Sequence, residues 1–149
     1  MNARMFAYTA LCQICIHKTY SNLYLRKELD KAEHKDKGLI TTIVYGTLQN
    51  YRLSRYQWED MVQKLPKEET AVLLDMSAYQ LFYMDKLPAY AIINEAVEIA
   101  KKHGGKKQGA LVNAVLHKVM QRGQRELPKD VLQKLAIKTS HPDWLIKMW

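Results

Sequence analysis

Two cysteines three residues apart are the first candidates for chemistry in this sequence. Cys12 and Cys15 form a CxxC motif, which in redox proteins places the first thiol at a helix N-terminus, where its pKa falls. Here the flanking apolar residues repeat at helical spacing, so we expect both cysteines to lie inside a helix. A zinc site would need two further ligands at matching spacing, and no second pair occurs. We therefore expect two cysteines in the core or at its boundary.

The glycine- and lysine-containing stretch GGKKQGA, which begins at Gly104, superficially resembles a phosphate-binding loop. That loop requires GxxxxGK followed by Ser or Thr, directly after a strand. Here Gly109 is followed by Ala110, and no strand is expected before it. A dinucleotide or S-adenosylmethionine site of the open-sheet kind would need strands as well. The sequence therefore predicts no cofactor site in these residues.

The histidines give no catalytic pattern either. They are scattered, and none has a Ser, Cys or carboxylate arrangement that indicates a triad; paired carboxylates do not stand out. We therefore expect no catalytic residue and no metal site in this chain. The five histidines are His17, His34, His103, His117 and His141.

The distribution of positive charge is more informative. The chain has 23 Lys and Arg against 15 Asp and Glu, a net charge of +8, which suggests a polyanionic partner such as nucleic acid or, less often, an anionic membrane. Residues 99–125 carry no acidic residue, and their lysines flank the Gly104-Gly105 turn. We expect these lysines to project together at one end of the fold; a merely solvated helix end is the alternative. The basic residues of the segment are Lys101, Lys102, Lys106, Lys107, Lys118, Arg122 and Arg125.

Two asparagines interrupt the apolar parts of this region. Asn94 follows Ile92-Ile93, and Asn113 lies between Val112 and Ala114. A buried amide is costly unless it is hydrogen-bonded. Either both amides lie near the core boundary, or each bonds backbone at a neighbouring helix end. We expect the second, which would lock helix register, with direct contact to nucleic acid as a further alternative.

Apolar residues recur at helical spacing almost everywhere, and no alternating strand pattern of useful length occurs. The fold class expected is all-α: a compact bundle of about seven to eight helices, with halves before and after Pro66 that share one core. The expected helices cover residues 6–15, 21–29, 36–50, 53–65, 67–85, 89–105 and 107–123, with a short eighth from residue 128.

The ends of the chain also allow predictions. No apolar run approaches the roughly 18 residues of a spanning helix, and the N-terminus has no signal pattern, so we expect a cytoplasmic protein without a membrane partner. The tail SHPDWLIKMW differs in character from the rest. We expect one helical domain over 1–127, followed by a linker and the start of a truncated domain over 128–149.

Four motifs carry a family resemblance that covers almost the whole chain. In this order they resemble the N-terminal part of the RsmB/Sun family, which comprises 16S ribosomal RNA cytosine-5 methyltransferases that use S-adenosylmethionine. That part is similar to the antitermination factor NusB, so the resemblance implies a NusB-like, all-helical RNA-binding fold. The motifs are VYGTLQN (44–50), AIINEAVEIAK (91–101), LVNAVLHK (111–118) and SHPDWL (140–145).

The resemblance implies an RNA-binding accessory domain that positions 16S ribosomal RNA for a catalytic domain absent from this chain. The implied partners are ribosomal RNA and the protein's own catalytic domain. S-adenosylmethionine would belong to the full-length protein, and this chain should be inactive alone. The family places arginine near the start of the first helix, where Arg4 stands, whereas Gln49 and His117 replace two of its usual arginines. The residues predicted to bind RNA are Arg4, Lys101, Lys102, Lys106, Lys107, His117, Lys118 and Arg122.

Two other functions remain open at this point. One is a free NusB-type antitermination factor, which would act in transcription regulation. The other is a protein–protein docking module that touches no RNA. The tail favours the methyltransferase branch, because a free factor should end after its seventh or eighth helix.

Overall fold

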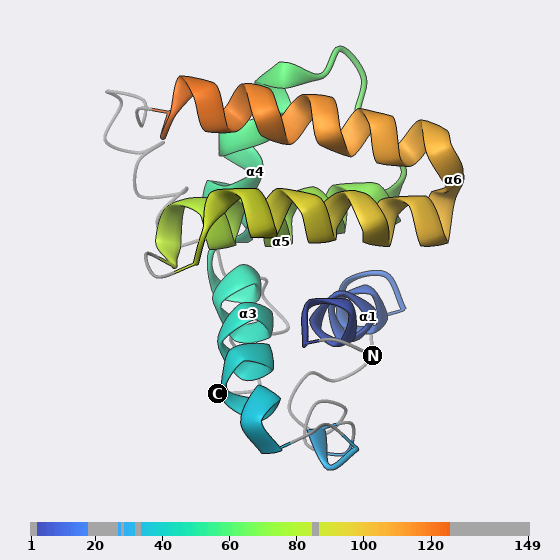
Figure 1. The fold of residues 1–149 in the computed structure, drawn as a ribbon, viewed down its shortest axis with the longest axis vertical. Coiled ribbons are helices and arrows are strands. Elements are labelled where there is room, and N and C mark those ends of the chain that lie inside the picture. The colour runs from blue at the N-terminus through green and yellow to red at the C-terminus, as the bar shows by residue number, and fades with distance from the viewer. Residues whose placement is uncertain (1–2, 18–26, 28, 32–33, 85–86, 126–149) are drawn as a thin grey trace.

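A computed structural model describes residues 3–17, 27, 29–31, 34–84 and 87–125, and in these residues every regular element is helical (Figure 1). The all-α prediction is confirmed for them. None of these helices is both long and apolar enough to span a bilayer. The elements are α1 (Ala3–Cys15), η1 (His34–Asp36), α3 (Lys37–Gln49), α4 (Tyr51–Trp58), η2 (Glu59–Met61), α5 (Glu68–Tyr83) and α6 (Ala89–Arg122).

The described part holds five α-helices, so the predicted count of seven to eight is not reached there. The helices expected over 89–105 and 107–123 form one element, α6, whose backbone breaks at Gly105 with φ 82° and ψ −176°. Figure 1 shows its two arms folded back against each other. The expected helix over 21–29 falls mostly on residues outside the described ranges. The helix from residue 128, the SHPDWLIKMW tail and the domain boundary at 127 lie wholly outside them.

Glycines permit the sharp reversal within α6. The positive φ of Gly105 is a conformation that residues with a side chain rarely adopt. Gly109 is buried where the second arm meets the side chain of Lys101, and a Cβ there would lie 2.5 Å from Lys101 Cγ. The two arms can therefore pack closely from the turn onward.

The helix expected over 53–65 ends earlier than predicted. α4 stops at Trp58, η2 adds a single tight turn, and Val62 is extended, with φ −122° and ψ 144°. A residue before proline disfavours helical geometry, and Leu65, which precedes Pro66, is 59% exposed. The apolar residues of this segment therefore keep helical spacing as far as Leu65, although the helix itself ends earlier.

α5 is the central helix, and it contacts α1, α3, α4 and α6. Pro66 precedes it, and Glu68 and Glu69 occupy its first turn, where carboxylates interact favourably with the helix dipole. Eleven of its 16 residues are buried, including several polar ones, so its surface is covered nearly all round. Its buried polar side chains consequently need partners inside the fold.

Asp75 of α5 is the most consequential of these polar groups. Its carboxylate accepts hydrogen bonds from Arg55 Nη2 and Trp58 Nε1, each at 2.8 Å. Burial raises the pKa of Asp75 to about 6, although the Arg55 charge and both hydrogen bonds act in the opposite direction. We call these three residues the Asp75 cluster; it ties α4 to α5.

One apolar core joins the two halves of the described chain, because a single cluster of buried residues draws on α1, α3, α4, α5 and α6. Cys12 and Cys15 lie in α1, half-buried and packed against this core, as expected. Burial raises the pKa of the Cys12 thiol to about 11, which leaves little of the nucleophilic thiolate.

Candidate nucleic-acid interface

Four lysines surround the turn of α6, and we call Lys101, Lys102, Lys106 and Lys107 the turn cluster. All four are exposed, at the end of the molecule where the two arms join (Figure 1). Lys101 pairs weakly with Glu98, at 3.7 Å between two well-exposed side chains. The other three have no ion pair with any residue in the described part of the chain. The structure thus brings these four charges together; whether they contact RNA stays a prediction.

The apolar residues of each arm explain why the lysines face outward. The first arm buries one stripe of apolar residues, Ile92, Ile93, Ala96 and Ile99. The second arm buries residues at the same helical spacing. Every lysine of the turn cluster lies off these two stripes. The core therefore fixes the direction of the charged face without any contact between the lysines.

His117 and Lys118 extend the basic surface along the second arm, since both are exposed. At 1.5 Å of rise per residue, His117 is roughly 16 Å from Lys106 along the helix. Together with the turn cluster they form an open track rather than a compact pocket.

Arg122 is the last residue of α6, roughly 24 Å along the helix from the turn, and Arg125 follows the helix; both contact α4 or η2. Arg122 forms an ion pair with Asp60 and donates to the Gln57 carbonyl. Arg125 lies over Tyr56, with its guanidinium carbon 3.9 Å from the ring centroid. The predicted site residue Arg122 therefore fastens α6 to α4 and η2 and does not lie with the turn cluster.

Arg4 is also committed to the fold. Its Nε donates to Gln80 Oε1 at 2.7 Å, it forms an ion pair with Glu95, and its side chain is only 12% exposed. These contacts join α1 to α5 and α6. Sequence reasoning missed Glu95 because the two partners are 91 positions apart and no local pattern links them.

The prediction for the two amides is wrong, because Asn94 and Asn113 are both exposed. Val112, Val115 and Leu116 define the buried stripe of the second arm, and Asn113 falls outside it at about 100° per residue. Apolar neighbours in sequence thus gave a misleading impression of burial. The angular position on the helix was the signal that could have corrected it.

A shallow depression of about 470 Å³ follows the outer seam between the two arms. On the first arm, Tyr90, Asn94, Val97 and Lys101 are spaced to share one stripe; on the second arm, residues 106, 110, 113 and 117 repeat that spacing. Tyr90 is 71% exposed. The residues that line the depression are Val97, Lys101, Lys106, Gly109, Ala110 and Asn113.

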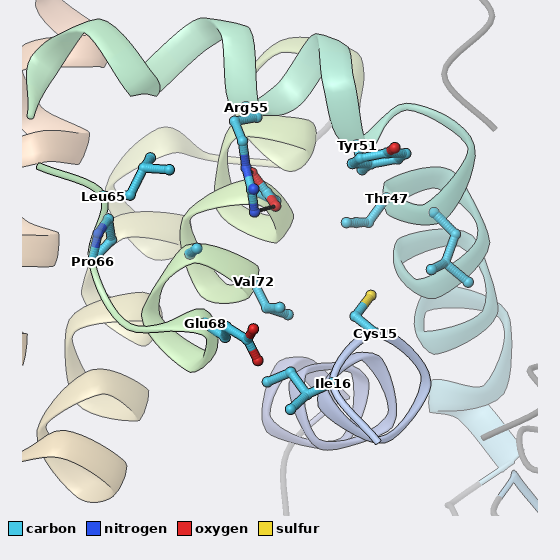
Figure 2. Close-up of a pocket in the computed structure, with 12 residues that line it drawn as sticks. Cys15, Ile16, Thr47, Tyr51, Arg55, Leu65, Pro66, Glu68 and Val72 are labelled. Carbon is cyan, nitrogen blue, oxygen red and sulfur yellow. Dashed lines mark hydrogen bonds and ion pairs between the residues drawn. The ribbon is translucent and has the colours of Figure 1, made fainter. Parts of the chain in front are cut away.

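A different pocket, of about 450 Å³, lies among α1, α3, α4 and α5 (Figure 2). Its lining is mostly apolar, with Arg55, Glu68 and Asp75 as the charged groups, and none of the turn-cluster lysines lines it. Arg55 is already bound to Asp75. This pocket therefore has neither the excess of positive charge nor the free cations that a polyanion would need.

The described residues contain no group of three or more His, Cys, Asp or Glu placed to hold a metal ion. His103, one of the five scattered histidines, contacts Met5 Sδ at 3.4 Å, and its ring centroid is 5.3 Å from that of Tyr8. The lysines of the turn cluster can attract phosphates, and the exposed rings and amides beside the seam can contact bases.

Comparison with known proteins adds three findings. A family model described as "NusB family" matches residues 1–121. The "Probable ribosomal RNA small subunit methyltransferase B" of Bacillus subtilis is 39% identical over 99% of this chain and 34% of its own length, and the Pseudomonas putida "Ribosomal RNA small subunit methyltransferase B" is 33% identical with the same coverage. The "Transcription antitermination protein NusB" of Halalkalibacterium halodurans is 29% identical over 80% of this chain and 91% of its own length. The chain thus spans about a third of the methyltransferases to which it is similar.

Proposed function

Because the chain belongs to the NusB family, we propose that it is an RNA-binding domain that holds RNA phosphates at the turn cluster. The observation that carries the proposal is the grouping of four exposed lysines with a single weak ion pair among the described residues. Their mutual repulsion is relieved when a polyanion binds, and phosphates are the usual polyanion for such a surface.

The stripes beside the seam favour a single strand over a duplex. Unpaired RNA is recognised by stacking on aromatic rings and by hydrogen bonds to base edges. Tyr90 offers an exposed ring, Asn94 and Asn113 offer amides, and His117 offers both a ring and a hydrogen-bonding group. The exposure of both amides therefore supports a place for them on the RNA-binding surface.

We further propose that the domain is an accessory part of a ribosomal RNA cytosine-5 methyltransferase of the cytoplasm, and that it positions 16S ribosomal RNA. The support is the identity of 39% and 33% to the two methyltransferases, which extends over 99% of the chain. In this proposal S-adenosylmethionine and the methyl-transfer chemistry belong to a separate catalytic domain, which is also a docking partner.

A free antitermination factor is the second candidate function. It is supported by the match to an antitermination protein that is covered over 91% of its length. The two functions share the RNA surface and differ in the RNA, so comparing a 16S ribosomal RNA fragment with an antitermination-signal RNA distinguishes them.

The test of RNA binding is the double variant Lys106→Glu/Lys107→Glu, examined by fluorescence anisotropy with a labelled single-stranded 16S ribosomal RNA fragment over a range of salt. We expect weaker binding, and each lost phosphate contact should reduce the log–log salt slope by roughly 0.7. The melting temperature should hardly change, because both side chains are exposed.

The matched control is Lys27→Glu/Lys64→Glu, which changes the net charge equally at two other exposed lysines. It should weaken binding much less. Equal losses in both double variants would mean that net charge acts at a distance. Unimpaired binding in the Lys106/Lys107 variant would place the RNA on another face, and no binding by the unaltered chain would favour a protein-docking module.

A further inference from the structure

Another pocket, of about 340 Å³, lies directly against the turn of α6. Residues from α1, from the first turn of α5 and from both sides of Gly105 line it. It is separate from the seam between the arms, since the two depressions share no lining residue. The parts used below are Tyr8, Lys67, Glu69, His103, Gly104 and Gln108.

Gln108 is held in a fixed position on the wall of this pocket. Its Oε1 accepts a hydrogen bond from Thr70 Oγ1 at 2.6 Å, which leaves its amide nitrogen without a partner among the described residues. Gly104 leaves room for this side chain, because a Cβ at Gly104 would come within 2.8 Å of Gln108 Cβ. The pocket thus contains an oriented hydrogen-bond donor that the fold itself does not use.

An aromatic wall stands in the same pocket. The rings of Tyr8 and His103 pack at 5.3 Å between centroids with a 56° tilt, and of the two residues His103 is exposed while Tyr8 is 4% exposed. The buried tyrosine thus supports the histidine from one side. A flat heterocycle that entered the pocket could stack on the supported imidazole.

The charges at the rim favour a base over a phosphate. Lys67 and Glu69 are both exposed there, so the rim carries one cation and one anion. The edge of a nucleobase displays donors and acceptors side by side and carries no net charge. A phosphate would meet a carboxylate here, whereas Lys102, Lys106 and Lys107 next to the pocket carry no such opposing group.

We propose that this pocket receives one unpaired base of an RNA strand whose phosphates lie on the turn cluster. The inference rests on the proposed RNA-binding function and adds a base-recognising subsite to it. Pocket and lysines share one turn of the chain, since Gly104 and Gln108 bracket Gly105, Lys106 and Lys107. The cavity volume is within the range that holds small flat ligands.

The test uses the double variant His103→Ala/Gln108→Leu with labelled 12-nucleotide oligomers of each base and an oligomer with one central abasic site. We expect the unaltered chain to favour one base, to lose affinity about 5- to 100-fold for the abasic oligomer, and to lose a similar factor through the double variant. The salt slope should stay unchanged, because the phosphate contacts remain.

Gln121→Leu is the control for Gln108→Leu, since it makes the same glutamine-to-leucine change at an exposed position of α6. It should leave affinity unchanged. If the double variant unfolds, His103→Ala alone, at an exposed ring, tests the same stacking contact. Fluorescence of 2-aminopurine adds a second measurement: quenching within an oligomer supports the proposal, whereas equal quenching of the free monophosphate would mean a pocket for free nucleotides and overturn it.

The outcomes separate the two proposals. Equal binding of abasic and intact oligomers, together with a loss in the Lys106/Lys107 variant, would overturn the base pocket and leave RNA binding standing. Failure of the unaltered chain to bind any oligomer would overturn both.

Discussion

The Asp75 cluster and the turn cluster handle charge in opposite ways. In the first, a buried carboxylate is matched by the Arg55 guanidinium and the Trp58 indole within hydrogen-bonding distance. In the second, exposed lysines crowd one turn, with Glu98 as their single weak partner among the described residues. The difference shows that a basic residue indicates a binding surface only where the fold leaves it without a counter-charge.

Arg4 and Arg122 show how much this distinction matters. Sequence reasoning grouped both with the lysines, but the structure gives Arg4 a partner in Glu95 and Arg122 a partner in Asp60. Both arginines therefore stabilise the fold through ion pairs between helices, whereas the lysines at the turn of α6 have only Glu98 as a partner among the described residues.

The largest expected effect is the loss of stability in Asp75→Ala, which disrupts the Asp75 cluster. Asp75→Ala leaves Arg55 and the Trp58 N–H unpaired, and removing one member of a buried pair costs about 3–5 kcal/mol. Urea denaturation should show this loss, while RNA affinity measured below the variant's melting temperature should be unchanged. Glu68→Ala, at an exposed carboxylate of the same helix, is the control and should cost less than about 1 kcal/mol. A loss that small for Asp75→Ala would mean that the cluster is not a structural centre.

The second prediction concerns the pH dependence of the same region. The pKa of Asp75 is raised to about 6 by burial, so between the unfolded value of 3.8 and 6 the folded state binds the extra proton. The stability contributed by this group is therefore fully present below pH 3.8 and falls as pH rises toward 6, by up to roughly 3 kcal/mol.

The free energies of unfolding of the unaltered chain and of Asp75→Asn, measured from pH 4 to 7, test the sign. The advantage of the aspartate should be larger at pH 4 than at pH 7. An advantage that grows toward pH 7 would show that the Arg55 ion pair outweighs the cost of burial, and that the pKa is lowered instead.

The third prediction concerns Arg4→Met, which tests whether Arg4 stabilises the fold or binds RNA. Loss of the contacts to Gln80 and Glu95 should cost about 1–3 kcal/mol of stability, with little change in RNA affinity. Glu95→Gln should show a smaller loss, since that side chain is 34% exposed and an amide can still accept from Arg4. Intact stability with weakened RNA binding would instead assign Arg4 to the RNA surface.

The features that sequence predicted correctly are those set by neighbours along the chain. Pro66 marked the break before α5, and the paired glycines marked the reversal within α6, because proline and glycine act locally. The turn cluster followed from that reversal alone.

The features that sequence missed depend on partners from distant parts of the chain. Trp58 and Arg55 meet Asp75 across two helices, and Arg4 meets Glu95 across 91 positions, so packing alone decides these pairs. The pocket against the turn of α6 likewise combines residues from α1, α5 and α6. Asn113 is a different case, since its helical angle was available and was outweighed by its apolar neighbours.

The smallest expected effect on stability is that of Asn113→Leu. A buried, bonded amide would make this change costly, but Asn113 is exposed, so stability should change by no more than about 0.5 kcal/mol. Leu116→Ala, three positions along the same arm at a fully buried site, should cost about 2–5 kcal/mol. If Asn113 belongs to the RNA surface, its variant should also bind single-stranded RNA a few-fold more weakly with an unchanged salt slope. A loss of stability close to that of Leu116→Ala would return Asn113 to the core, and unchanged RNA binding would leave it as a solvated amide beside the seam.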